Sequence, residues 1–171
     1  KIDKVSNNSV AYNDDSSTIE DIKKILFIKF LNNSNLDEEL NLLSEIISNE
    51  NAHYLDKILI LKNKLDFDYQ NLTNEYKSIR NLYLKKKIVD KKNNYLVKII
   101  IPIIDIKPSN KSSFRNKDLS IFKDTKELLN NKKFSESIER LKSLKFQEEY
   151  LDAFIYKVSI YADFKNTLEL L

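Results

Sequence analysis

Residues 118–144 read DLSIFKDTKELLNNKKFSESIERLKSL, and this stretch decides the fold class. On both sides of residues 130–133, apolar positions recur every three or four residues, which is the period of one face of an α-helix. Four polar residues leave room only for a tight connection, so the two predicted helices lie antiparallel as a hairpin. The spacing of one tetratricopeptide hairpin is imitated by Asn131, Phe134, Ser137 and Leu141. Because no second copy follows at the required period, we expect repeat-like geometry rather than a repeat protein.

Helical periodicity continues on both sides of this hairpin. Downstream, a long helix is expected from about Gln147 to the end of the chain. Upstream, apolar stripes predict four more helices, which begin near Ser17, Asn35, His53 and Asp68. We therefore predict an all-α fold, a helical bundle or array of about seven helices. The predicted core comprises Leu26, Leu40, Leu43, Ile47, Leu59, Leu72, Ile79, Leu129, Ile138, Leu141 and Phe154.

Composition divides the chain into a lead-in and one helical domain. Residues 1–17 are polar and aperiodic, so they are predicted to be disordered. The single domain spans residues 18–171, a length that can bury a real core. Within it, residues 18–106 form an N-terminal helical part and residues 107–117 form a linker by composition. Residues 118–171 hold the hairpin and the long helix.

The run YLVKIIIPIIDI at residues 95–106 is the exception to helical periodicity. Its uniform β-branched character fits either a buried strand or a helix end that continues as extended chain. Pro102 cannot occupy a central strand position, which favours helix to about Ile100 and at most a minor extended segment afterwards. With 12 residues and two charges, the run is too short and too polar to span a bilayer.

The residue types that are missing exclude several classes of chemistry. The chain has no glycine and no cysteine, so Gly-rich phosphate loops, cysteine nucleophiles and Cys-based zinc sites are impossible. Its single histidine, His53, is read as a polar residue at a helix start, although it could serve as a general base or pH switch. We therefore expect no catalytic site, no metal and no cofactor. The absence of methionine makes us expect a fragment or a processed product.

Basic residues are concentrated between Tyr76 and Lys98. This segment holds eight basic residues and one acid, a net charge of +7, which leaves −4 for the rest of a chain whose total is +3. A solvated helix face explains such a run without any partner, and no nucleic-acid-binding motif accompanies it. The apolar residues interleaved with these lysines favour contact with an anionic membrane surface. The predicted lipid-binding residues are Lys85, Lys86, Lys87, Lys91 and Lys92.

The long C-terminal helix offers a second surface. Its apolar residues exceed what one buried stripe needs, so we expect a partner-binding edge that contacts a second copy of the chain or another envelope protein. The predicted partner-binding residues are Tyr150, Phe154 and Tyr161. Neither nucleic acid nor a small-molecule substrate is expected to bind.

Several stretches, taken in order, resemble bacterial mitofilin-family proteins over roughly residues 19–171. The family's G-x-P-F-x-x-E-L-like segment is matched by residues 33–40, and its L-V-R-V-R-like segment by residues 96–100. Its G-V-P-like turn corresponds to residues 66–68, followed by Leu72 and Tyr76. The C-terminal signature is matched by Leu128 and Leu129, residues 131–134, Ile138 with Leu141, and Phe154 with Ile155. The family glycines are replaced by Asn or Asp, and its tryptophan is absent.

The resemblance implies a non-catalytic scaffold on the periplasmic side of an inner membrane. Such a protein is anchored by an upstream transmembrane helix and a coiled coil, and it organises and bends the membrane. A HemX-like envelope protein has a related layout. A tetratricopeptide-like helical adaptor that binds peptides or proteins is the alternative, and an enzyme of unknown type is the third reading.

Overall fold

A computed structural model of the chain describes residues 15–91, 117–145 and 148–171. These residues form seven α-helices and one short 3₁₀ helix, with no strand among them, which confirms the predicted all-α fold. The elements are α1 (Asp15–Leu31), α2 (Asp37–Ile46), η1 (Asn49–Asn51), α3 (Ala52–Asn63), α4 (Tyr69–Lys91), α6 (Lys117–Asn130), α7 (Phe134–Lys142) and α8 (Glu149–Leu170).

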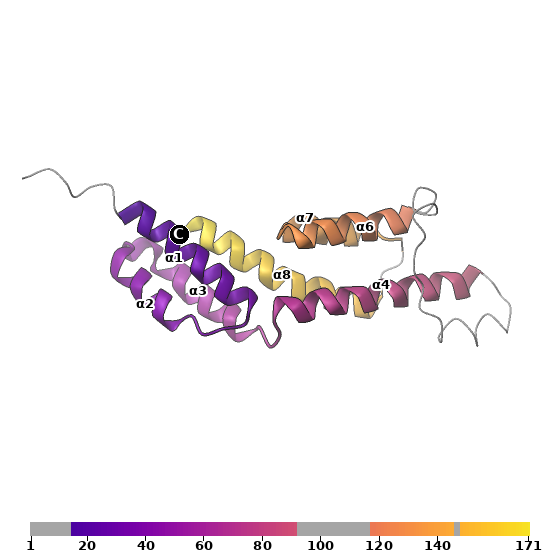
Figure 1. Ribbon diagram of the computed structural model, residues 1–171, viewed down its shortest axis with the longest axis horizontal. Coiled ribbons are helices and arrows are strands. Elements are labelled where there is room, and N and C mark those ends of the chain that lie inside the picture. Colours follow the sequence, from indigo (N-terminus) through magenta and orange to yellow (C-terminus); the bar gives the residue numbers. More distant parts are fainter. Residues whose placement is uncertain (1–14, 92–116, 146–147) are drawn as a thin grey trace, which may run out of the picture.

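The long helix α8 organises the molecule, which is elongated along the direction of this helix (Figure 1). It packs against α1 and α3 at one end of the molecule and against α4 and α7 further along. Its central residues Val158, Tyr161 and Phe164 are fully buried. A helix that is apolar around most of its circumference belongs inside a fold, and the surrounding helices provide that cover.

Two helices end in the same glycine-free turn. After α1, the Ser34 N–H donates to the Lys29 carbonyl at 2.8 Å, and Asn33 has φ of 52°. After α6, the Lys133 N–H donates to the Leu128 carbonyl at 2.9 Å, and Lys132 has φ of 58°. Both are Schellman-type ends, which normally place glycine at the left-handed position. Asparagine tolerates that position, and Lys132 compensates in part by placing its ammonium over the Tyr69 ring, 3.1 Å from the centroid.

Most of the predicted core is buried. Leu26, Leu40, Leu43, Leu72, Ile79, Leu129, Leu141 and Phe154 are buried, while Ile47 and Ile138 are half-buried against the same cluster. The prediction for Leu59 is wrong, because this side chain is 41% exposed. The buried residues of α3 are Ile58 and Leu61, and Leu59 is rotated by about 100° from Ile58.

The predicted starts of the helices are close to those observed. The helix α1 begins at Asp15, so the last three residues of the predicted lead-in are helical, and the acid at that position favours a helix N-terminus. Asn35 accepts from the Asp37 N–H at 2.7 Å, as expected of a residue that opens α2. The predicted helix end near Ile100 and the extended segment after it lie outside the described residues, as does most of the predicted linker. In the part of the chain that the structure describes, no helix is both long and apolar enough to cross a bilayer.

Candidate functional site

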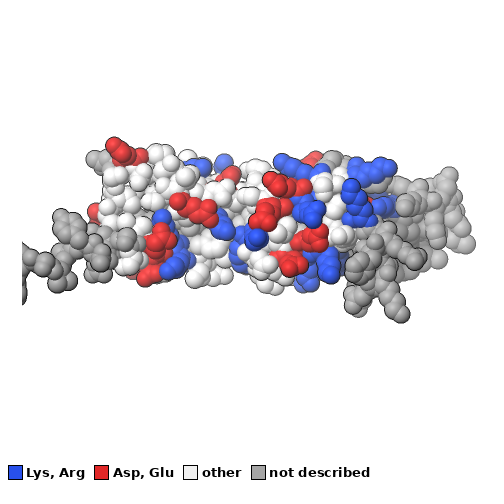
Figure 2. All heavy atoms as spheres, turned by 90° about the horizontal axis from the view of Figure 1, so that it is seen from above, with Lys and Arg blue, Asp and Glu red and all other residues white. Residues whose placement is uncertain are grey.

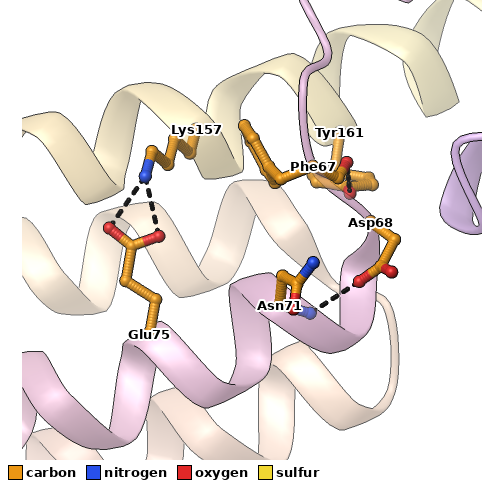
Figure 3. Close-up of polar contacts among 6 residues, drawn as sticks. All are labelled: Phe67, Asp68, Asn71, Glu75, Lys157 and Tyr161. Carbon is orange, nitrogen blue, oxygen red and sulfur yellow. Dashed lines mark hydrogen bonds and ion pairs between the residues drawn. The ribbon is translucent and has the colours of Figure 1, made fainter.

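The first turns of α4 are fixed by contacts with the preceding loop and with α8 (Figure 3). The Asn71 N–H donates to the Asp68 carboxylate at 2.7 Å, which caps the start of the helix. Lys157 on α8 donates to both carboxylate oxygens of Glu75 at 2.9 and 2.8 Å. The Tyr161 hydroxyl donates to the Phe67 carbonyl at 3.3 Å. These contacts set the rotation of α4 and therefore the direction of its tyrosines.

Three tyrosines at intervals of seven residues join α4 to α6. The Tyr69 hydroxyl donates to the Leu129 carbonyl at 2.5 Å, and the Tyr76 hydroxyl donates to the Phe122 carbonyl. The Tyr83 hydroxyl lies 3.4 Å from a carboxylate oxygen of Asp118. Seven residues make almost two full helical turns, so the three rings project from one face of α4. We call Tyr69, Tyr76 and Tyr83 the tyrosine ladder.

Burial raises the pKa of two phenols of this ladder. The pKa of Tyr69 rises to about 12, and the pKa of Tyr76 also rises. Both hydroxyls therefore stay hydrogen-bond donors well above neutral pH, and their bonds to the Leu129 and Phe122 carbonyls link α4 to α6. The ladder was not predicted from the sequence. The interval of seven residues between the tyrosines can be read from the sequence. The groups that accept hydrogen bonds from their hydroxyls belong to α6, which lies far along the chain.

The surface above Tyr69 and Tyr76 is hollowed into a groove of about 290 Å³ between α4 and α6. Lys77 and Lys126 line it, and no carboxylate is among its lining residues. Within the described residues neither lysine forms an ion pair, and the Lys77 ammonium donates a hydrogen bond to the Asn74 side-chain oxygen at 3.3 Å. The remaining lining residues are Gln70, Thr73, Leu129 and Asn130. We call this hollow the basic groove.

The other side of α6 has the opposite charge. A broad depression of about 580 Å³ between α6 and α7 is lined by four carboxylates, from Asp124, Glu127, Glu136 and Glu139. Two cations also line it, and Arg140 pairs with Asp124 at 3.1 Å while Lys133 pairs with Glu136 at 3.3 Å. Figure 2 shows acidic and basic side chains crowded over the part of the molecule that holds α6 and α7. The helix α6 thus separates a net acidic surface from the basic groove.

The predicted lipid-binding lysines lie at the far end of α4. Lys86 pairs with Glu148 at 2.6 Å, and Lys87 pairs with the buried Asp118. Lys85 is half-buried. The side chain of Lys91 and the whole of Lys92 lie outside the described residues. Intramolecular ion pairs therefore neutralise two of these five lysines.

The predicted partner-binding edge of α8 is wrong for two of its three residues. Phe154 and Tyr161 are fully buried, because the surrounding helices cover the apolar faces of α8 that the sequence left unassigned. Tyr150 is half-buried, and its hydroxyl has no hydrogen-bond partner among the described residues. Burial raises the pKa of Tyr150 to about 12. Phe154 and Tyr161 are therefore core residues, whereas partner binding by Tyr150 stays a prediction.

His53 lies exposed at the start of α3, and its Nδ1 is 2.8 Å from the Glu50 carbonyl oxygen. This is the polar helix-start position predicted from the sequence. Among the described ranges, no group of three or more His, Cys, Asp or Glu side chains is arranged to hold a metal ion.

Comparison with protein-family models, curated proteins and solved structures found no match to this chain. The resemblance to mitofilin-family proteins therefore stays a prediction.

Proposed function

We propose that this protein is a non-catalytic helical adaptor whose basic groove binds an acidic segment of a protein partner. The observation that carries the proposal is the pair Lys77 and Lys126, which face a preformed groove without a carboxylate among its lining residues. Elsewhere on the described surface many lysines have acidic partners within the chain, as Lys86 and Lys87 do. Lys77 and Lys126 form no ion pair with any described residue, and two such cations beside a hollow favour a ligand that brings the negative charge.

The lining of the groove supports a peptide as that ligand. Its apolar lining comes from Tyr69, Tyr76 and Leu129, and the half-buried ring of Tyr69 can contact an apolar side chain. The amides of Gln70 and Asn130 can both donate and accept hydrogen bonds, as an extended peptide backbone requires. A volume of about 290 Å³ accommodates one or two side chains rather than a folded domain. Because the tyrosine ladder already fixes the floor, little ordering is needed when a ligand binds.

Nucleic acid fits this groove less well. Phosphate backbones are bound by rows of cations, and single strands stack their bases on exposed aromatic rings. The groove offers two lysines, and Tyr76 is buried with its hydroxyl engaged by Phe122. The membrane-scaffold role implied by the mitofilin resemblance is a separate prediction, and it depends on the lysine run at the far end of α4.

The experiment is a fluorescence anisotropy titration of a labelled peptide in which glutamates alternate with leucine and phenylalanine. Binding should weaken as salt rises, because the two lysines act largely through charge. The double variant Lys77→Glu/Lys126→Glu should lose at least about tenfold in affinity, since two attractions become repulsions. The matched control is Lys57→Glu/Lys64→Glu, which makes the same charge change at two exposed lysines outside the groove.

Two outcomes would overturn the proposal. One is a wild-type chain that ignores the acidic peptide at low salt, and the other is a control variant that loses as much affinity as the groove variant. RNA oligonucleotides and anionic vesicles are titrated in parallel. If either binds more tightly than the peptide and loses binding in the groove variant, the groove serves a different class of ligand.

A further inference from the structure

The basic groove lies between two helices that run in opposite directions (Figure 1). On α4, Tyr76 comes after Tyr69, whereas the residue that Tyr76 contacts on α6, Phe122, comes before Leu129, which Tyr69 contacts. Both intervals are seven residues, so the two helices keep the same register along the groove. The register gives the level of every lining residue on one helix relative to the other.

The two lysines of the groove start at different levels. Lys77 follows Tyr76 on α4, so it lies level with the residue before Phe122 on α6. Lys126 is four residues beyond Phe122, so five residues, or about 7.5 Å, separate the two lysines along the groove. The backbone of Lys126 is therefore closer to the Tyr69 end of the groove than the backbone of Lys77.

The tilt of helical side chains brings the two ammonium groups together. Side chains on a helix lean toward the N-terminus of their own helix. Lys77 follows this rule, because its ammonium donates to the side chain of Asn74, three residues earlier on α4. Because α6 runs the other way, the same lean carries Lys126 toward Lys77. Both lysines thus reach the middle of the groove from opposite walls, near the level of Thr73.

Two converging cations suit a single group that carries two negative charges. One carboxylate brings one charge and leaves one lysine without a counter-ion. Neighbouring glutamates of an extended peptide point to opposite faces, and alternate glutamates are about 7 Å apart, so neither pair concentrates its charge at one point. A phosphoryl group carries a charge of about −1.5 to −2 at neutral pH on three oxygens of one phosphorus atom.

We propose that the basic groove binds a phosphorylated side chain of the partner, with Lys77 and Lys126 on the same phosphoryl group. This inference rests on the proposed function, because it names the negative group of the acidic segment. Neither a carboxylate nor a histidine is among the residues that line the groove, so none of them repels or competes for a dianion. The oxygens of a phosphoryl group accept hydrogen bonds, and the amides of Gln70 and Asn130 add donors to those of the lysines.

Anisotropy titrations of labelled peptides that differ at one site test the proposal. Between leucines, the peptides carry serine, phosphoserine, one glutamate, or two neighbouring glutamates that match the charge of phosphoserine. The phosphopeptide should bind at least about tenfold more tightly than either glutamate peptide, because only its charge is held on one group. Its affinity should fall from pH 7 to pH 5, because the phosphoryl group gains a proton near about pH 6, whereas the glutamate peptides should change little.

Single substitutions distinguish one shared anion from two separate contacts. Lys77→Gln and Lys126→Gln should each lower the affinity for the phosphopeptide to roughly that for the single-glutamate peptide, because one lysine remains. The matched control is Lys57→Gln, which changes an exposed lysine outside the groove and should behave as wild type. All three side chains are exposed, so circular dichroism should show unchanged helices.

A phosphopeptide that binds no more tightly than the two-glutamate peptide overturns this inference and leaves the proposed function in place. A failure of every peptide to bind overturns both. Inorganic phosphate and vesicles that contain phosphoinositides are titrated at the same ionic strength, because each supplies the same chemical group. If either binds more tightly than the phosphopeptide and loses binding in Lys126→Gln, the groove takes free phosphate or a lipid headgroup, and the assignment to a phosphorylated side chain is wrong.

Discussion

The packing of α1 on α8 can be tested by shortening Phe30. Its ring stacks on Phe164, with centroids 3.6 Å apart and planes 14° apart, and it meets the edge of Tyr161 at 5.5 Å. All three side chains are fully buried. Phe30→Ala should lower the free energy of unfolding by about 3–5 kcal/mol, the cost of lost burial together with the cavity that remains. A domain of this size has only about 5–15 kcal/mol in total, so the loss is a large fraction.

Urea unfolding followed by far-ultraviolet circular dichroism measures this change. Ile28→Ala is the matched control, because Ile28 is on the same helix but exposed, and it should shift stability by no more than about 0.5 kcal/mol. Phe30→Leu keeps most of the volume and should cost less than Phe30→Ala. Because α8 contacts helices from both parts of the chain, each variant should unfold in a single transition.

The reasoning is refuted if Phe30→Ala and Ile28→Ala have the same small effect. That result would mean that α1 does not bury its aromatic row against α8. Two separate unfolding transitions in the wild type would refute the claim that α8 joins the two parts into one cooperative unit.

Three further predictions concern titratable groups. Because the pKa of Tyr69 is raised from 10.0 to about 12 in the folded chain, its contribution to stability is complete below pH 10 and is lost as the pH rises to about 12. Tyrosinate absorbance should show this late step, and Tyr69→Phe should remove it. Asp118→Ala should cost about 2–3 kcal/mol in urea unfolding, because it removes a largely buried ion pair with Lys87. Lys157→Ala should cost only about 0.5 kcal/mol, and less at high salt, because its ion pair with Glu75 is partly exposed.

The helices could be predicted because local signals are sufficient for them. Apolar spacing located each of the seven, and Asn35 marked the start of α2 before any partner was known. The turn after α1 could also be predicted, because asparagine is the best substitute for glycine at a left-handed position. Lys132 was not expected at such a position, since its compensation depends on Tyr69, more than sixty residues earlier.

Long-range contacts explain what the sequence could not show. An apolar stripe predicts that a helix is covered but not how much of it is covered, so Phe154 and Tyr161 were mistaken for a surface. For the predicted lipid-binding lysines, the sequence likewise showed the charge but not that Lys87 pairs with Asp118 and Lys86 with Glu148, which lie far along the chain. Conversely, the basic groove combines Lys77 and Lys126, which are separated by almost fifty residues and belong to no common motif.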